Sequence, residues 1–361
     1  MKAVHVETGR HFYGGAQQVI WLLEGLVAAG VDCELVCPPD SDIASRASAL
    51  GVSVVEMPCA GDHDIRFMWR LRNFLRKAKP DLVHCHSRRG ADFWGGRAAR
   101  AAGIPAVLSR RVDSLESSYF SRLRYKPFNK VIAISGNIAT VLNTAGINSD
   151  RLVVIRDAVD VDSVNQAPEA DVLSRYFDLT EKHFAIAVVA QLIRRKGHRF
   201  LFDVLPSLVF KNPQIRVVVF GVGTDEVQLR ALARKLGLSG AVKFAGFRLD
   251  LDEYLAAFDL LVHPAEKEGL GVAMLKGASA GLPVIAFDVA GAKEAVAHGK
   301  TGALIPAGDV ESLQKAIELM IEEPEMRRSL GAAGRQRMRD EFSVQAMVES
   351  HIALYDQLSN G

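Results

Sequence analysis

The stretch Phe184–Gly223, FAIAVVAQLIRRKGHRFLFDVLPSLVFKNPQIRVVVFGVG, predicts one strand–helix–strand unit. Its ends, FAIAVVAQL and IRVVVFGVG, are apolar runs typical of buried strands. The segment Gly197–Phe210 between them predicts an amphipathic helix. Repetition of such units builds a parallel sheet that helices cover on both faces.

The same alternation runs through the whole chain. Upstream strand predictions are KAVHVE, CELVCPP, VSVVEMP, DLVHCH, PAVLSR, KVIAIS and LVVIRD, and downstream ones are AVKFAG, DLLVHP, PVIAFD and GALIP. The segment 162–169 has no strong period and contains Pro168, which marks a link. We therefore expect an α/β protein with two doubly wound domains, residues 1–165 and 166–343, and a final helix within 344–361. In such tandem domains a ligand is expected in the cleft between them, at the carboxyl ends of the strands.

Composition favours a folded, soluble enzyme. The chain has 361 residues, 49% of them hydrophobic and 24% charged, which suits two domains without a disordered linker. The start, MKAVHVETGRHF, lacks the apolar region of a signal peptide, and no apolar run reaches the roughly 18 residues of a membrane span. A cytoplasmic protein is expected. The four cysteines form no C-x-x-C pair, which favours reduced, buried thiols.

Positive charge is concentrated in one window. Between Arg66 and Lys130 there are sixteen Lys/Arg against four Asp/Glu, whereas the whole chain has a net charge of +2. An excess of this size indicates an anionic partner. The low aromatic content, 7%, and the absence of a recognised module argue against nucleic acid.

Three loops carry candidate anion-binding residues. Arg194, Arg195 and Lys196 follow the strand FAIAVVAQL, where a diphosphate leaving group would need cations; a solvated basic turn is the alternative. Two glycine pairs precede helices and suit either close approach to a phosphate, sugar or base, or tight turns. These pairs are Gly14 with Gly15 and Gly221 with Gly223.

The stretch EKEGLGVAMLKGASAGLPVIAF, Glu266–Phe287, combines an acid, a glycine turn and one cation. Glu268 precedes a helix predicted to start near Leu270. Its carboxylate either stabilises the positive end of that helix or accepts hydrogen bonds from sugar hydroxyls. The N–H groups of Gly269, Leu270 and Gly271 are expected to be free beside it. Lys276, the one charge between Leu270 and Phe287, either reaches back towards Glu268 or extends to solvent.

No metal site is expected. Three D-x-D triplets are scattered over loops, which shows how common the pattern is. His84 and His86 point to one face of a strand, but no further ligand at suitable spacing completes a site.

The segment HPAEKEGLGVAMLKGASAGLPVIAFDVAGAKEAV closely resembles the donor-site signature of glycosyltransferase family 4, the retaining nucleotide-sugar enzymes of the GT-B architecture. GGAQQV, PDLVHCHS, KVIAISGNI, LIRRKGH and AAFDLLVHP follow in family order, so the resemblance covers almost the whole chain.

The resemblance implies a role for several residues. Glu268 matches the first Glu of the family's E-x7-E motif, which holds the transferred sugar, with Gly269–Gly271 near sugar and diphosphate. Lys196 matches the cation that neutralises the departing diphosphate, assisted here by Arg195 and Arg194. Gly15, beside Gly14, matches the loop that approaches donor phosphate and acceptor. The family needs no metal, and its terminal helix usually crosses back onto the first domain.

The sequence also departs from the family pattern. Lys276 stands where the second Glu of the motif normally bonds the nucleotide ribose, and we hypothesise that it faces a phosphate or carboxylate of the donor. Gln191 replaces an Arg five residues before Lys196. Arg110 and Arg111 stand where many members carry a His near the reacting centre.

The resemblance implies retaining transfer of a sugar from a nucleotide-diphosphate sugar, with a UDP-sugar favoured, to a saccharide or lipid-linked saccharide in envelope glycan synthesis. Arg88, Arg110 and Arg111 are the acceptor-side candidates, and the basic window suits an anionic acceptor or the inner leaflet of the membrane. Two alternatives remain open: a non-catalytic homologue that binds a sugar phosphate or a partner, and a GT-B phosphorylase or epimerase.

Overall fold

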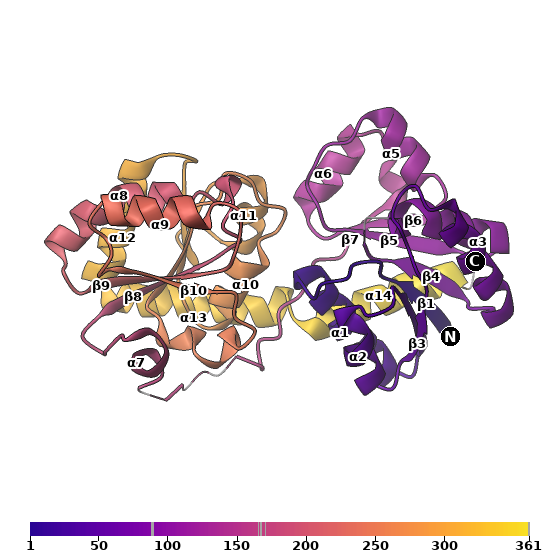
Figure 1. Cartoon of the computed structure of the whole chain (residues 1–361), viewed down its shortest axis with the longest axis horizontal. Helices are drawn as coiled ribbons and strands as arrows, with labels where there is room; N and C mark the ends of the chain where they lie inside the picture. Colours follow the sequence, from indigo (N-terminus) through magenta and orange to yellow (C-terminus); the bar gives the residue numbers. More distant parts are fainter. Residues whose placement is uncertain (88–89, 165, 167, 170, 360–361) are drawn as a thin grey trace. The chain divides into compact units, whose positions relative to one another are not determined.

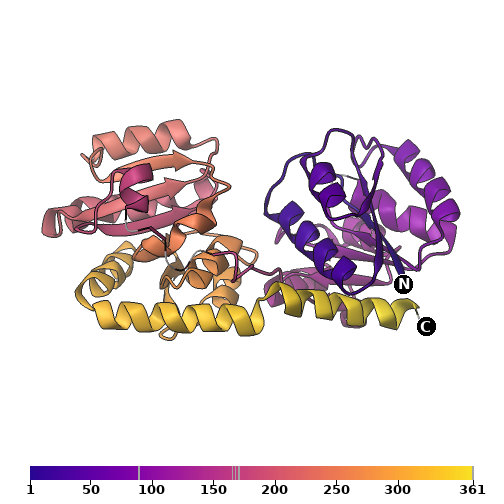
Figure 2. The same ribbon diagram turned by 90° about the horizontal axis from the view of Figure 1, so that it is seen from below.

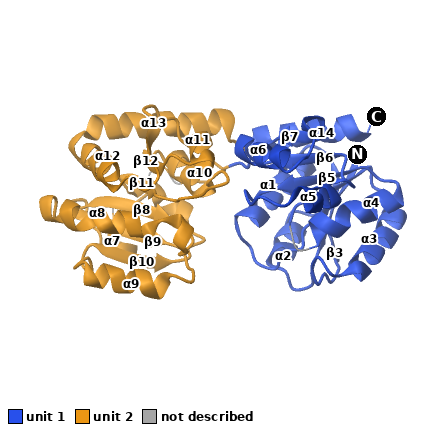
Figure 3. Ribbon diagram, turned by 90° about the horizontal axis from the view of Figure 1, so that it is seen from above, with its two compact units in different colours: residues 1–158, 344–361 blue, residues 159–343 orange. Residues whose placement is uncertain are grey.

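The computed structural model describes residues 1–87, 90–164, 166, 168–169 and 171–359. The chain divides into two compact units, Met1–Ala158 with Val344–Gly361, and Val159–Ser343. Figure 3 colours them separately. Each unit has its own sheet and its own hydrophobic core.

Unit 1 contains seven parallel strands in the order β3-β2-β1-β4-β5-β6-β7. The strands are β1 (Lys2–Val6), β2 (Asp32–Cys37), β3 (Ser53–Glu56), β4 (Leu82–Cys85), β5 (Ala106–Arg110), β6 (Lys130–Ala133) and β7 (Leu152–Val154). The central strands β1, β4 and β5 are buried along almost their whole length because helices cover both faces of the sheet.

The helical segments of unit 1 lie between these strands, and one more ends the chain. They are α1 (Gly14–Ala28), α2 (Asp42–Ala49), α3 (Ile65–Ala78), η1 (Ala91–Gly95), α4 (Gly96–Ala102), α5 (Ser118–Tyr125), α6 (Gly136–Thr144), η2 (Ser149–Arg151) and α14 (Val344–Ser359). The glycine pair was expected to precede a helix, but α1 begins at Gly14, so Gly14 and Gly15 are its first residues. The helix α5 was not predicted.

The last helix, α14, packs on unit 1 (Figure 2). Met347, Val348, Leu354 and Tyr355 belong to the core of that unit. A Cβ atom at Gly25 would lie 2.4 Å from Val348 Cγ2, so α1 and α14 approach as closely as only glycine allows. The chain therefore returns to unit 1 after completing unit 2.

Unit 2 contains six parallel strands in the order β10-β9-β8-β11-β12-β13. They are β8 (Phe184–Val189), β9 (Ile215–Phe220), β10 (Val242–Gly246), β11 (Leu260–His263), β12 (Val284–Phe287) and β13 (Gly302–Ile305). In both units the strand order reverses beside the first strand, as in the doubly wound dinucleotide-binding fold. The reversal point lies between β1 and β4 in unit 1 and between β8 and β11 in unit 2.

Helices cover both faces of the second sheet, with α8, α9 and α12 on one face and α10 and α13 on the other (Figure 1). The helical segments are α7 (Val172–Phe177), η3 (Arg194–Lys196), α8 (His198–Lys211), α9 (Glu226–Lys235), η4 (Leu251–Glu253), η5 (Leu255–Ala257), α10 (Val272–Ser279), α11 (Ala290–Ala295), α12 (Val310–Glu322) and α13 (Pro324–Glu341). The predicted segment Phe184–Gly223 thus forms β8, η3, α8, β9 and the start of the next loop.

The boundary between the units lies seven residues before the predicted one at residue 165. Gln18 in α1 binds both the N–H and the C=O of Ala158, each at 2.7 Å. The next residue, Val159, instead donates its N–H to Phe342 O at 2.9 Å and bridges to Ser343. The aperiodic stretch that suggested the link therefore belongs to unit 2.

The four cysteines are free, and Cys33, Cys37 and Cys85 are buried while Cys59 is partly buried. Burial raises the pKa of the Cys33 thiol to about 12. Within the described residues, no helix is both long and apolar enough to cross a bilayer.

Candidate active site

Lys196 and Glu268 meet at the reversal point of the second sheet. Lys196 ends η3, the turn that follows β8, and Glu268 lies in the loop between β11 and α10. Lys196 Nζ donates a hydrogen bond to Glu268 Oε2, and each side chain is only 11% exposed. Two residues 72 positions apart thus form one ion pair at the edge where this fold binds ligands.

Three donors surround the Glu268 carboxylate. Besides Lys196, His263 Nε2 lies 2.8 Å from Oε2, and the Gly269 N–H lies 3.2 Å from Oε1. Burial by itself would raise the pKa of Glu268, but the hydrogen bonds and charges of His263 and Lys196 outweigh burial and hold the pKa well below its usual range. Glu268 is therefore an ionised carboxylate that accepts hydrogen bonds.

The two loops that carry this pair are in direct contact. Gly197 follows Lys196 with φ of +70°, and a Cβ atom there would lie 1.8 Å from Pro264 O. The Glu266 N–H donates to Arg195 O at 2.9 Å. The exposed Arg195 side chain donates to Lys267 O at 3.4 Å. Arg194 and Arg195 are therefore exposed beside Lys196 in the same turn, and of the three cations Lys196 is the one that binds Glu268.

The predicted glycine loop after β9 packs against the loop after β8. Cβ atoms at Gly221 and Gly223 would lie 2.0 Å from Ala190 O and 2.3 Å from Leu192 O. Gln191, between those two residues, is exposed. Both glycines are thus required by backbone packing, and their predicted contact with a phosphate or base remains a prediction.

The turn before α10 differs in part from the prediction. The helix starts at Val272, and Gly271 is its N-cap with φ of +80°. The expectation of a free Gly269 N–H is wrong, because Glu268 accepts it. Leu270 is buried. No acceptor occupies the N–H of Leu270 or Gly271 in the part of the chain that the structure describes.

Lys276 has a partner that the sequence did not reveal. Its Nζ lies 2.6 and 2.8 Å from the two carboxylate oxygens of Asp252 in η4. The side chains of Lys276 and Asp252 are 23% and 24% exposed. Lys276 therefore binds Asp252 in η4, and its predicted contact with an anion of the donor remains a prediction.

In unit 1 the predicted residues Gly15 and Arg111 come together. The Cβ position of Gly15 lies 3.6 Å from Arg111 Cδ, and Gly14 has open space around it. Arg111 Nε lies 3.2 Å from Asp157 Oδ1, and Arg111 Nη1 donates to His86 O at 3.2 Å. The start of α1 and Arg111 thus share the carboxyl edge of the first sheet.

Arg110 does not join them. It is 3% exposed and holds its own loop, with hydrogen bonds to Val112 O and Ser114 O and an ion pair to Glu116 at 3.1 Å. The prediction that Arg110 faces the acceptor is wrong, because Arg110 is buried at the end of β5 and its side-chain N–H groups are bonded within its own loop. Arg88 lies outside the described residues.

Residues 173–337 match the family Glycosyl transferases group 1, and residues 13–163 match Glycosyltransferase Family 4. The alpha-maltose-1-phosphate synthase of Mycolicibacterium smegmatis is 30% identical over 318 residues, covering 77% of this chain and 79% of that protein. The chain belongs to glycosyltransferase family 4. The lipopolysaccharide core biosynthesis glycosyltransferase LpsE of Rhizobium meliloti is 29% identical and covers 98% of both chains.

Solved structures agree with this family 4 assignment. The crystal structure of Anabaena Alr3699/HepE in complex with UDP superposes with a TM-score of 0.88 at 21% identity, covering 99% of this chain and 100% of that one. The two doubly wound units thus have the fold of the GT-B architecture, and the family match shows that the chain is a glycosyltransferase.

The sequence patterns of this glycosyltransferase did not single out Glu7 and His5, two buried polar residues of unit 1. Glu7 follows β1, and burial raises its pKa while its Oε1 accepts the Gly9 N–H at 2.7 Å. The sequence signal that could have identified Glu7 is an acidic residue directly after a predicted buried strand. His5 was missed because it meets His84 and His86 across neighbouring strands.

The three histidines lie close enough together to ligate a metal ion, so the expectation that no metal is bound remains a prediction. Their ring nitrogens lie within 4.8 Å of one another, and all three side chains are buried. Both nitrogens of His84 are already used, by Tyr355 Oη at 2.5 Å and Ser109 Oγ at 2.8 Å. His5 and His86 bind each other at 2.9 Å. These bonds give the cluster a role in packing α14 onto the sheet.

Proposed function

We propose that this glycosyltransferase moves a sugar from a nucleotide-diphosphate sugar, with a UDP-sugar favoured, to a saccharide or lipid-linked saccharide in envelope glycan synthesis. The resemblance to retaining enzymes implies that the anomeric configuration is kept. The observation that carries the proposal is the Lys196–Glu268 pair at the reversal point of the second sheet.

The pair has the two chemical properties that such a donor needs. A lysine cation compensates the charge that develops on a departing diphosphate. An ionised carboxylate orients a sugar by accepting its hydroxyl bonds. In the absence of donor the two groups bind each other, and a bound donor would replace that contact with its own oxygens and hydroxyls. Arg194 and Arg195 add positive charge in the same turn as Lys196.

The choice of UDP is supported by the structural relatives. Anabaena Alr3699/HepE, which has the same fold, was crystallised with UDP and with UDP-glucose. Leu270 and Gly271 directly precede α10, and their N–H groups have no acceptor among the described residues; helix starts of this kind commonly bind phosphates.

The acceptor class is supported by relatives and by charge. LpsE acts in lipopolysaccharide core biosynthesis. The basic window between Arg66 and Lys130 lies in unit 1 and suits an anionic saccharide or a lipid-linked acceptor at the inner leaflet. Arg111, beside Gly15, is the remaining described candidate for the acceptor side. Nucleic acid is not expected as a partner.

We also expect turnover without a divalent metal. The Lys196 cation would compensate the charge on the departing diphosphate that a metal ion compensates in other enzymes. The carboxylates of the nearest D-x-D triplet are engaged, Asp250 with Arg248 at 2.8 Å and Asp252 with Lys276. Activity should therefore survive an excess of EDTA.

A thermal-shift panel of nucleotide sugars tests the proposal. A ligand at 100 times its dissociation constant adds about 2.7 kcal/mol of stability. We expect at least one UDP-sugar to raise the melting temperature of the wild type and to be without effect on Lys196→Ala. The proposal would be refuted if no nucleotide sugar raised the melting temperature and if no UDP were released from any UDP-sugar.

A further inference from the structure

The helix α5 exposes apolar side chains on its outer face. Tyr119, Phe120 and Leu123 are 74%, 61% and 42% exposed, whereas Ser121 and Tyr125 face the core. At helical spacing the exposed arc also contains Arg122 and Lys126. Large apolar groups beside cations on one helix face are typical of a surface that binds at a membrane interface.

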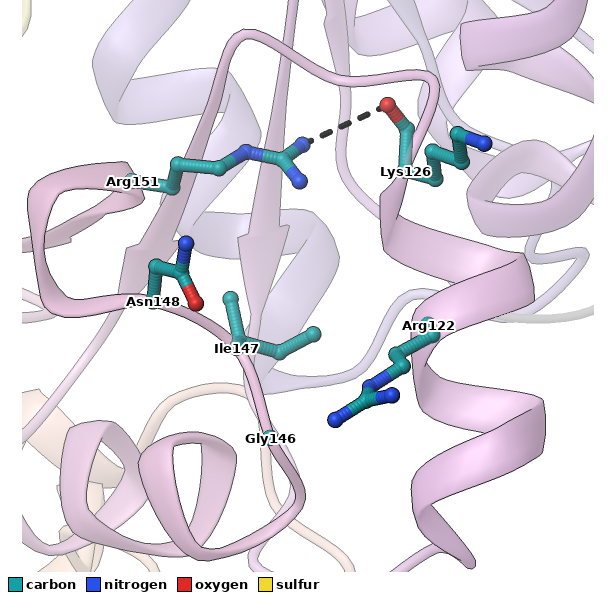
Figure 4. A pocket seen from close by; sticks show the side chains of 6 residues that line it. All are labelled: Arg122, Lys126, Gly146, Ile147, Asn148 and Arg151. Atoms are coloured by element: carbon teal, nitrogen blue, oxygen red, sulfur yellow. Dashed lines mark hydrogen bonds between the residues drawn. The ribbon is translucent and has the colours of Figure 1, made fainter.

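A cationic pocket of about 240 Å³ adjoins this face. It lies between the end of α5 and the segment Gly146–Arg151, and the guanidinium groups of Arg122 and Arg151 enter it (Figure 4). Gly146, with φ of +88°, allows the approach, because a Cβ atom there would lie 3.4 Å from Arg122 Nε. Arg151 is held by the carbonyl groups that end α5, including Tyr125 O at 2.8 Å.

The positive charge of this pocket is not compensated. Arg122 and Lys126 make no side-chain hydrogen bond or ion pair with the described part of the chain. Lys126 also lines a second pocket with Arg97 and Arg100, and neither lining contains a carboxylate. Of the nearby acids, Asp92 and Glu116 bind the partly buried Arg124 at 2.7 and 3.4 Å. Asp150, next to Arg151 in the chain, is exposed and does not line the pocket.

The pocket is separate from the candidate active site. It lies at the amino ends of β6 and β7, near Lys130 and Leu152, where those strands begin. Gly15, Arg111 and Asp157 lie at the opposite, carboxyl edge of the same sheet. A ligand in the pocket would therefore not occupy the acceptor position of unit 1.

We propose that the outer face of α5 is a docking surface for an anionic membrane, with one phospholipid phosphate between Arg122, Lys126 and Arg151 and with Tyr119, Phe120 and Leu123 in the interfacial layer. Charge complementarity selects the headgroup, and the exposed apolar groups favour a lipid over a dissolved anion. This inference rests on the proposed function, in which the acceptor is linked to a membrane lipid. It assigns the membrane association of the protein to one surface, the outer face of α5.

Co-sedimentation of the full chain with lipid vesicles tests the surface. We expect binding to phosphatidylcholine vesicles that contain phosphatidylglycerol and little binding without it. Neutralising each cation should lower the partition coefficient about fivefold, so Arg122→Gln with Lys126→Gln should lower it about 25-fold. Phe120→Ser with Leu123→Ser should lower it about tenfold.

The matched control is Arg234→Gln with Lys235→Gln, two exposed cations in the last turn of α9 in unit 2. The control should bind vesicles as the wild type does. Wild-type binding that ignores anionic lipid, or unchanged binding of the Arg122/Lys126 variant, would overturn the inference. Stabilisation by inorganic phosphate without vesicle binding would also overturn it.

The test separates this surface from the proposed function. The Arg122/Lys126 variant should keep the UDP-sugar affinity of the wild type, because the pocket is at the other edge of the sheet. If the wild type binds anionic vesicles but neither binds nor cleaves any nucleotide sugar, the proposed function fails while the docking surface stands.

Discussion

The Lys276 ammonium lies 2.6 Å from a carboxylate oxygen of Asp252, 24 residues earlier in the chain. A cation in the otherwise apolar helix α10 is therefore neutralised within unit 2. Because both side chains are about a quarter exposed, the pair should contribute only about 0.5–1 kcal/mol.

A double-mutant cycle measures this contribution. Lys276→Met and Asp252→Asn should each lower the free energy of unfolding, and the double variant should lose less than the sum of the two. Urea unfolding of the four proteins gives the coupling energy. Strictly additive losses would show that the pair is not formed in solution.

The same variants address the hypothesis that Lys276 faces an anion of the donor. Lys276→Met should then weaken nucleotide-sugar binding, whereas Asp252→Asn, which releases the ammonium, should leave it unchanged or tighten it. Titration calorimetry with the donor provides the measurement. Equal donor affinity for the wild type and Lys276→Met would remove the hypothesis.

Lys196→Ala should lower kcat/KM by about 10²–10³, because it removes the cation that faces the leaving diphosphate. Arg199→Ala is the matched control, since Arg199 at the start of α8 pairs at 3.2 Å with Glu266, in the same loop as Glu268, but forms no ion pair with Glu268. Steady-state release of UDP measures both. Similar losses in the two variants would point to a general loss of loop structure instead.

Gly221→Ala should destabilise unit 2 by several kcal/mol, about 3 or more. Gly221 has φ of +135°, and the added Cβ atom would lie 2.0 Å from Ala190 O. Gly237→Ala is the control, because Gly237 also has a positive φ, +72°, but has nothing within 4 Å; it should cost about 1 kcal/mol. Equal unfolding free energies for both variants would contradict the packing argument.

Acid should destabilise unit 1 through its buried histidines. Burial lowers the pKa of His5 to about 3 and that of His351 to about 4, and it also holds the pKa values of His84 and His86 low. An unfolded histidine has a pKa of about 6.5. Above that pH both states are neutral and stability is constant. As the pH falls from 6.5 towards 4, only the unfolded state gains protons, so stability falls.

Each such histidine contributes up to about 1.4 kcal/mol per pH unit in that range. Urea unfolding at several pH values measures the slope. His351→Leu should make it shallower, while His11→Gln, at an exposed position, should not. A stability that stays constant from pH 7 to pH 5 would contradict the buried, neutral state of the cluster.

The sequence predicted the doubly wound fold because buried parallel strands leave largely apolar runs along the chain. Lys196 and Glu268 were found because each belongs to a local motif at a strand end. The structure brings them together, but their catalytic roles remain predictions.

Pairings between distant segments could not be predicted. Lys276 was interpreted without Asp252 because the contact depends on how η4 packs against α10. Arg110 was expected to face an acceptor because it lies in the basic window, where many family members carry a His near the reacting centre, whereas it is buried at the end of β5 and paired with Glu116. His5 lies on a different strand from His84, so no spacing along the chain could reveal the cluster.

The central claim is that Lys196 and Glu268 hold the donor between them. A crystal structure of the chain with a UDP-sugar tests it most directly. The account predicts a diphosphate oxygen within about 3 Å of Lys196 Nζ and a sugar hydroxyl at the same distance from the Glu268 carboxylate. A donor bound elsewhere, with the ion pair between Lys196 and Glu268 intact, would contradict it.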